Sequence, residues 1–173
     1  MKTETEKIIQ FTLLYNRYKK RLYNFLLKLS GNQMTAEDIT QSVFLKLFEN
    51  FETLNNKESA NYWIFKTARN EYFNFYKREK RKSELNENLI TNKQDDFEVE
   101  SYIELNEIKK IVLCELDKMN AEQKEVYLLK EYGGLSYTEI SKTLNIETKL
   151  VKSRLYKVRQ KLIEKISKKI MER

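Results

Sequence analysis

The strongest constraint on the fold lies in residues 136–163, SYTEISKTLNIETKLVKSRLYKVRQKLI, which read as a short helix, a three-residue turn and a longer helix. Ser136 is followed three positions later by Glu139, the capping-box pattern in which each side chain bonds the other residue's backbone N–H. We therefore expect the short helix to begin after Ser136, with Leu135 and Ile140 packed as a hydrophobic staple across its start. This order of elements predicts a helix-turn-helix.

The longer helix of this segment has one apolar and one polar face. Apolar residues recur at steps of three and four, which predicts a buried stripe of Val151, Leu155, Val158, Leu162 and Ile166. The opposite face carries Lys149, Lys152, Ser153, Tyr156 and Gln160. Lys, Ser and Gln side chains bond base edges in the major groove and further cations bind phosphates, so this face indicates DNA binding. A Lys-rich amphipathic helix that only faces solvent is the alternative.

The composition favours a helical protein. The 173 residues are 34% charged and 40% hydrophobic, with no Pro, three Gly and few strand signals. This length supports one or two small domains with ordinary cores. Residues 148–173 hold ten Lys and Arg against two Glu, whereas residues 84–107 hold eight acidic residues and a single Lys. We expect an all-α protein that binds a polyanion.

The residue types that the chain lacks argue against catalysis and metal binding. Cys114 is the only cysteine and there is no His, which excludes an internal disulfide framework and a transition-metal ligand set. The sequence has no Gly-rich phosphate loop and no nucleophile elbow. No apolar run approaches the roughly 18 to 20 residues that span a bilayer, and the N-terminus has no signal-peptide pattern. We expect a cytoplasmic, non-enzymatic protein without catalytic residues, metal, cofactor or membrane contact.

Three helices are predicted in the N-terminal half. The first has apolar residues at helical spacing and ends at Gly31, a residue suited to the left-handed position that follows a helix. The second is expected to begin with Thr35 as its N-cap. Its buried side is predicted to comprise Ile39, Val43, Leu47 and Phe51. Another face of the same helix carries Asp38, Gln41 and Leu45.

The third predicted helix, from near Ser59 to about Lys82, is unusually aromatic. Seven of the fifteen residues from Tyr62 to Tyr76 are aromatic, more than one side of a small three-helix core is expected to bury. Opposite its predicted buried stripe of Ile64, Ala68, Tyr72 and Phe75 lies a polar stripe of Lys66, Asn70, Asn74, Lys77 and Arg81. Rings that stack on bases beside cations that follow phosphates suit unpaired nucleic acid. Alternatively, the aromatic residues form the core and the stripe is solvated surface.

Two domains are therefore predicted. Residues 1–82 form the first, and residues 83–101 are polar, acidic and without sustained periodicity, which indicates a linker. Residues 102–173 form the second, a four-helix unit in which one helix begins after Asn120 and ends at Gly133-Gly134. The helix-turn-helix closes this second domain.

In this order, the segments resemble the bacterial sigma factors of the small two-domain, extracytoplasmic-function type, over nearly the whole chain. Residues 13–31, LLYNRYKKRLYNFLLKLSG, and 36–48, AEDITQSVFLKLF, resemble the family's first conserved region with its polymerase-binding helix. Residues 61–82 resemble the element that recognises and melts the minus-10 promoter motif, and residues 133–162 resemble the minus-35 reader. The resemblance implies a transcription initiation factor that binds core RNA polymerase and promoter DNA. It also implies the polymerase flap and an anti-sigma factor as partners.

The resemblance also assigns residues to roles. Asp38 and Gln41, with Leu45 on the same face, match the positions that meet the clamp helices of the polymerase's largest subunit. Asn70 and Asn74 match the positions around the captured minus-10 base, beside a specificity loop from about Leu54 to Ser59. The remaining minus-10 candidates are Trp63, Lys66, Lys77 and Arg81. The minus-35 candidates are Lys149, Lys152, Ser153, Tyr156, Lys157 and Arg159.

The chain departs from the family pattern at three places. The family often has Leu-Pro where this chain has Met119-Asn120, a Glu where it has Ser42, and Gly-Thr where it has Lys149-Leu150. The last change lies at the start of the recognition helix, so we expect modest minus-35 specificity from this chain alone. Two alternatives follow: a sigma-like adaptor that a second DNA-targeting protein brings to DNA, and an ordinary helix-turn-helix transcriptional regulator.

Overall fold

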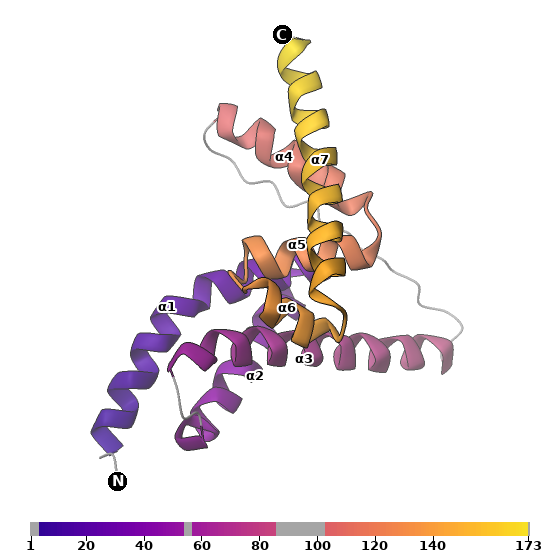
Figure 1. The fold of residues 1–173 in the computed structure, drawn as a ribbon. Coiled ribbons are helices and arrows are strands. Elements are labelled where there is room, and N and C mark those ends of the chain that lie inside the picture. Colours follow the sequence, from indigo (N-terminus) through magenta and orange to yellow (C-terminus); the bar gives the residue numbers. More distant parts are fainter. Residues whose placement is uncertain (1–3, 54–56, 86–102, 173) are drawn as a thin grey trace. The chain divides into compact units, whose positions relative to one another are not determined.

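The computed structural model describes residues 4–53, 57–85 and 103–172, and within these ranges the chain is helical without a strand (Figure 1). The chain divides into two compact units, Met1–Asp95 and Asp96–Arg173. The predicted all-α class is therefore confirmed. The predicted linker, residues 83–101, begins inside the last helix of the first unit and otherwise lies outside the described residues.

The first unit contains α1 (Glu4–Ser30), α2 (Gln33–Glu49), the short 3-10 helix η1 (Phe51–Thr53) and α3 (Lys57–Leu85). As predicted, α1 stops at Gly31, the residue after its last helical position, whose φ of +67° is a conformation that glycine adopts without steric cost. The predicted N-cap of α2 was wrong: the helix begins at Gln33, and Asn32 accepts the Thr35 amide at 2.9 Å. Asn32 competes successfully because asparagine is at least as good a cap as threonine.

The core of the first unit lies where α1, α2 and α3 pack on one another. Phe25 of α1 meets Phe65 of α3 edge to face, with ring centroids 5.4 Å apart. Full burial of one such large apolar side chain contributes about 1.5–3 kcal/mol. The predicted buried stripe of α3 is only partly confirmed, because Ile64 and Ala68 are buried whereas Tyr72 and Phe75 are half-buried. The fully buried core residues of α1 and α2 include Leu22, Leu26, Val43 and Leu47.

The second unit contains α4 (Ile103–Asp117), α5 (Ala121–Glu131), α6 (Tyr137–Leu144) and α7 (Thr148–Met171). Asn120 caps α5 by accepting the Gln123 amide at 2.8 Å. Residues 145–147 separate α6 from α7, so the predicted helix-turn-helix with its three-residue turn is confirmed. Asn145 makes this turn in the left-handed conformation, with a φ of +53°, which asparagine tolerates better than most residues.

The predicted start of α6 is also confirmed in detail. The Ser136 hydroxyl accepts the Glu139 amide at 3.2 Å, and the Glu139 carboxylate accepts the Ser136 amide at 2.7 Å. Leu135 and Ile140, the predicted staple residues, are both fully buried. One cluster of the second core joins α4 and α7 through Leu116, Met119, Val158 and Leu162.

Candidate nucleic-acid interface

The outer face of α7 is held in place by the packing of its inner face. Val151, Leu155 and Val158 are buried, so the face opposite them is turned to solvent. All six minus-35 candidates are exposed: Lys149, Lys152, Ser153, Tyr156, Lys157 and Arg159. Tyr156 has 65% of its surface exposed. An exposed tyrosine among lysines offers an apolar ring and a hydroxyl beside cations.

Two arginines of α7 bind glutamates of α5 within the second unit. Arg159 donates from Nη2 to Oε1 of Glu131 at 2.8 Å, and Arg154 contacts Glu122 in the same way. The bond to Glu131 raises the pKa of Arg159, so its guanidinium stays charged. Arg159 thus has an intramolecular partner that the sequence pattern did not reveal, because Glu131 lies 28 residues earlier on another helix.

A cationic cluster around Tyr137 was missed by the sequence analysis. The Lys130 Nζ atom lies 4.9 Å and the Lys152 Nζ atom 5.7 Å from the centroid of the Tyr137 ring. Lys130 also donates to the Leu135 carbonyl at 3.1 Å. These side chains come from α5, α6 and α7, so no single helical period connects them. The cluster extends the cationic surface from the outer face of α7 to the start of α6.

The polar stripe of α3 is exposed along its whole length, at Lys66, Asn70, Asn74, Lys77 and Arg81. Trp63, the remaining minus-10 candidate, is half-buried. The aromatic residues divide between the two predicted alternatives: Phe65 belongs to the core, Tyr76 is exposed, and the others are half-buried. Tyr72 and Tyr76 stack with ring centroids 6.3 Å apart. The predicted specificity loop falls partly on residues 54–56, outside the described residues.

One face of α2 combines polar groups with exposed apolar ones. Asp38 and Gln41 are exposed, and Leu45 is 65% exposed. Met34, one turn before Asp38, is 74% exposed and was not among the predicted residues. Its spacing of four from Asp38 was the signal that could have found it. Large apolar side chains exposed beside polar ones are typical of a protein-binding surface.

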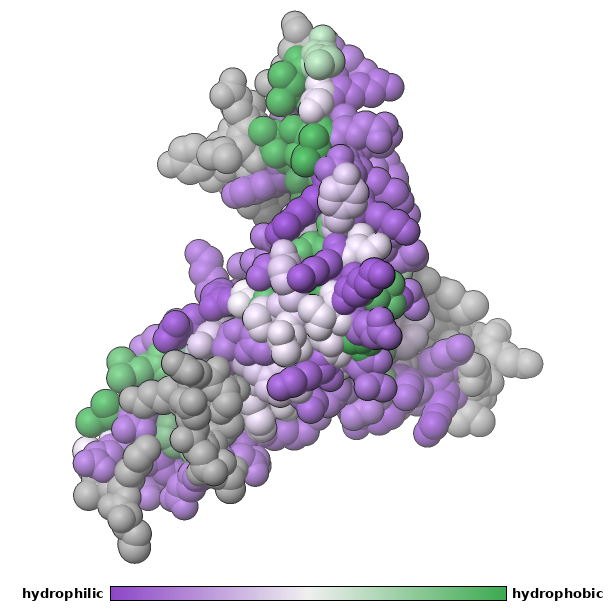
Figure 2. Space-filling view, viewed as in Figure 1, coloured by the Kyte–Doolittle hydropathy of each residue, from purple (hydrophilic) through white to green (hydrophobic). Residues whose placement is uncertain are grey.

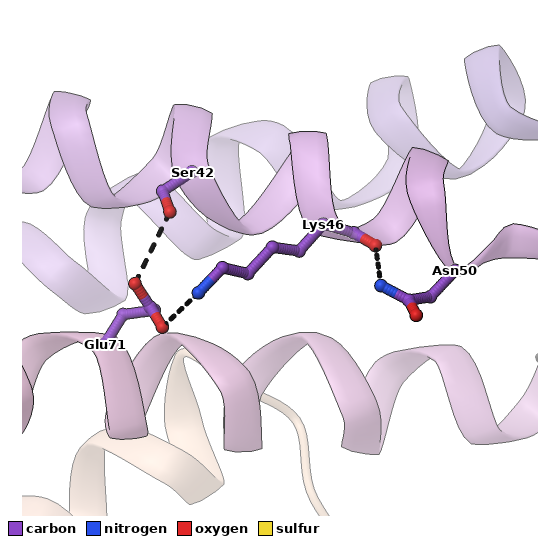
Figure 3. Close-up of polar contacts among 4 residues, drawn as sticks. All are labelled: Ser42, Lys46, Asn50 and Glu71. Carbon is purple, nitrogen blue, oxygen red and sulfur yellow. Dashed lines mark hydrogen bonds and ion pairs between the residues drawn. The ribbon is translucent and has the colours of Figure 1, made fainter.

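A polar bridge joins α2 to α3 beside this face (Figure 3). The Lys46 Nζ atom lies 2.5 Å from Oε1 of Glu71, and the Ser42 hydroxyl donates to Oε2 of Glu71 at 3.4 Å. Ser42 and Lys46 each follow a residue of the exposed α2 face, whereas Glu71 follows Asn70. The bridge therefore links residues that are next in sequence to members of the two candidate faces of the first unit.

The C-terminal half of α7 carries apolar side chains on its surface (Figure 2). Ile163 and Ile170 are exposed, and so is Ile108 of α4. Within the described ranges, no helix is both long enough and apolar enough to cross a bilayer. The same ranges hold no group of three or more Cys, Asp or Glu side chains that could bind a metal ion.

Family models match both units. Sigma-70 region 2 matches residues 14–82 and Sigma-70 region 4 matches residues 109–162, together more than half of the chain. The RNA polymerase sigma factor YlaC of Bacillus subtilis (strain 168) is 25% identical over 157 residues, covering 90% of this chain and 91% of that protein. The ECF RNA polymerase sigma factor SigM of the same strain is 28% identical over 152 residues, covering 86% and 90%.

The fold is also found among solved structures. The sigma factor RpoE from Bartonella quintana, crystallised with the anti-sigma factor NepR, aligns with a TM-score of 0.74 at 21% identity, covering 91% of this chain and 97% of RpoE. All but the last residue of the predicted helix-turn-helix falls inside the segment matched by Sigma-70 region 4, and α2 and most of α3 fall inside region 2. The chain therefore belongs to the extracytoplasmic-function sigma factors and is a transcription initiation factor that acts with core RNA polymerase and promoter DNA.

Proposed function

We propose that the first unit binds core polymerase through α2 and holds the melted minus-10 region on α3, while the second unit reads the minus-35 element with α7. The observation that carries this proposal is the exposure of two polar faces on adjacent helices, Asp38 with Gln41 on α2 and Asn70 with Asn74 on α3. The polymerase performs the chemistry, so the chain itself needs no catalytic residue. Its place of action is that of the polymerase, the cytoplasm.

Energetics favour a stabilising role for α3 in promoter opening. Extracting a base from the stack costs a few kcal/mol, whereas stacking on an aromatic side chain contributes roughly 1–3 kcal/mol per base. Tyr76 is exposed and Trp63 half-buried, so each offers ring surface, and the amides of Asn70 and Asn74 present both donors and acceptors. Lys66, Lys77 and Arg81 supply cations for the phosphates of the opened strand.

Polymerase binding is proposed to use two surfaces of different chemistry. On α2, Asp38 and Gln41 flanked by Leu45 meet the clamp helices of the largest subunit. On the second unit, Ile163 and Ile170 of α7 and Ile108 of α4 are exposed, and we propose that these apolar side chains meet the flap. An apolar surface of this kind gains roughly 25 cal/mol for each Å² that a partner buries. The RpoE neighbour was crystallised with an anti-sigma factor, so we propose a protein of that class as a further partner.

The start of α7 supports the alternative of a sigma-like adaptor that a second DNA-targeting protein brings to DNA. Lys149 and Leu150 open α7, Leu150 is 41% exposed, and the N-cap Glu147 makes no side-chain capping bond. A glutamate and a bulky apolar side chain at the end of the helix nearest the groove oppose close contact with the phosphate backbone. A second DNA-targeting protein would compensate for weak minus-35 binding.

The decisive experiment is reconstitution of the chain with core polymerase on a library of promoter fragments. The expected result is start-site-specific transcription that depends on this chain, with a shared minus-10 motif among the selected fragments. Binding of the free chain to DNA without any stimulation of core polymerase would instead support the ordinary regulator.

A further inference from the structure

Glu71 is an unusual residue for its position on α3. It is the only acidic residue between Ser59 and Arg78, a segment that contains Lys66, Arg69, Lys77 and Arg78. It also directly follows Asn70, a candidate for contact with the unpaired base. A carboxylate at this point repels DNA phosphates unless a cation neutralises it.

The structure turns this carboxylate away from solvent and toward α2 (Figure 3). Oε1 of Glu71 pairs with Lys46 at 2.5 Å and Oε2 accepts from Ser42 at 3.4 Å, so both oxygens have partners on the other helix. The Glu71 side chain is 21% exposed and that of Lys46 is 42% exposed. The Asn50 side chain donates to the Lys46 carbonyl at 2.8 Å, a hydrogen bond that closes the last turn of α2, to which Lys46 belongs.

The bridge lies where α3 leaves the core. The buried residues of α3 end at Ala68, Tyr72 and Phe75 are half-buried, and residues 76–82 are all exposed. Apolar packing therefore holds the first half of α3, and the contacts of Glu71 with α2 are made where this packing gives way to the exposed second half. That second half carries Asn74, Lys77 and Arg81.

We propose that Glu71 is a positioning residue that couples the polymerase-binding helix α2 to the DNA-holding half of α3 through Lys46 and Ser42. The inference rests on the proposed function of these two faces. The bridge sets the direction of α3 relative to α2, so that Asn70 and Asn74 stand at a fixed place once α2 is docked. It also neutralises a carboxylate that would otherwise oppose DNA.

The test is a charge-swap cycle in the full chain assembled with core polymerase. The variants are Glu71→Lys, Lys46→Glu and the two together, and open-complex formation is measured on duplex promoter DNA and on a template already mismatched at minus 10. Partly exposed ion pairs contribute little free energy, so each single variant is expected to reduce opening of the duplex about two- to five-fold. The loss on the mismatched template is expected to be smaller. The swapped pair is expected to recover most of the loss.

A matched control is Lys7→Gln, which breaks the pair of Lys7 on α1 with Glu52 of η1, outside both candidate faces, and is expected to leave opening unchanged. Affinity for core polymerase and the melting temperature are measured for every variant, because a merely structural role would lower both along with opening. Equal losses on both templates, or a swapped pair that opens no better than the single variants, would overturn the proposal. Asn70→Ala, measured beside them, tests the minus-10 face itself, so a failure of the proposed function is distinguished from a failure of the bridge.

Discussion

Asn70 and Asn74 are four residues apart on α3, so their amides occupy one exposed face, one turn from each other. If these amides address an unpaired base, Asn70→Ala removes contacts that exist only after the strands separate. We expect the variant to impair open-complex formation several-fold more on duplex DNA than on a template mismatched at minus 10. Asn16→Ala, an exposed asparagine of α1, is the control. Equal losses on both templates would mean that Asn70 only supports the fold.

The exposed residues of α7 are expected to divide into two groups by their effect on DNA binding. We propose that Lys152 and Ser153 contact base edges, so Lys152→Ala and Ser153→Ala should relax sequence preference by about 1–3 kcal/mol at one position. Lys157→Ala should weaken binding to all sequences. It should also reduce the slope of log binding constant against log salt concentration by about one. Titrations with specific and scrambled duplexes at several salt concentrations measure both effects. A uniform loss from Lys152→Ala would assign that lysine to phosphate instead.

Single residues were predictable from the sequence where one helical period decides their exposure. The outer faces of α3 and α7 follow from the apolar stripes opposite them, and the structure exposes every predicted polar residue of these faces. Trp63, a minus-10 candidate from the resemblance and not from this pattern, is half-buried. Contacts between helices were not predictable in this way. The pairs of Arg159 with Glu131 and of Lys46 with Glu71 join residues 28 and 25 positions apart, and a single sequence contains no signal for them.

At the level of elements, some helix starts were predictable from the sequence and others were not. Ser136 with Glu139 is a two-residue signal and predicted the start of α6 correctly, whereas Asn32 and Thr35 are both acceptable caps and the sequence alone did not rank them. The end of α3 was placed near Lys82, and the helix continues to Leu85. The absence of Pro and Gly there leaves nothing in the sequence to stop a helix.

The capping box gives a prediction at this scale. Ser136→Ala removes the acceptor for the Glu139 amide and is expected to destabilise the second unit by about 0.5–2 kcal/mol. Calorimetric melting of the full chain measures the loss, and hydrogen exchange at the Glu139 amide locates it. Ser167→Ala, an exposed serine within α7, is the control and should leave both unchanged. Equal stability of the two variants would contradict the role of the box.

At the scale of the whole molecule, polymerase binding is expected to depend on one face of α2. Replacing Asp38 and Gln41 together by Ala changes exposed side chains, so helix content should stay constant while affinity for core polymerase falls at least ten-fold, about 1.4 kcal/mol. The matched control replaces Gln33 and Glu37, an exposed pair bonded at 3.1 Å on the neighbouring side of the same helix. Circular dichroism and a binding titration with core polymerase measure the two properties. Unchanged affinity of the first variant would favour the ordinary regulator.

The two-unit organisation sets the last prediction, because we propose that each unit binds a different promoter element and that the two contributions add within one polymerase complex. The α3 face has five exposed polar side chains, whereas α7 opens with Lys149, the exposed Leu150 and an N-cap glutamate. We therefore expect footprints of the polymerase complex without other proteins to show clear minus-10 protection and weak, salt-sensitive minus-35 protection. Leu150→Thr, which shortens the apolar side chain, should strengthen the minus-35 footprint. Strong, sequence-selective minus-35 protection by the unmodified chain would rule out the need for a second DNA-targeting protein.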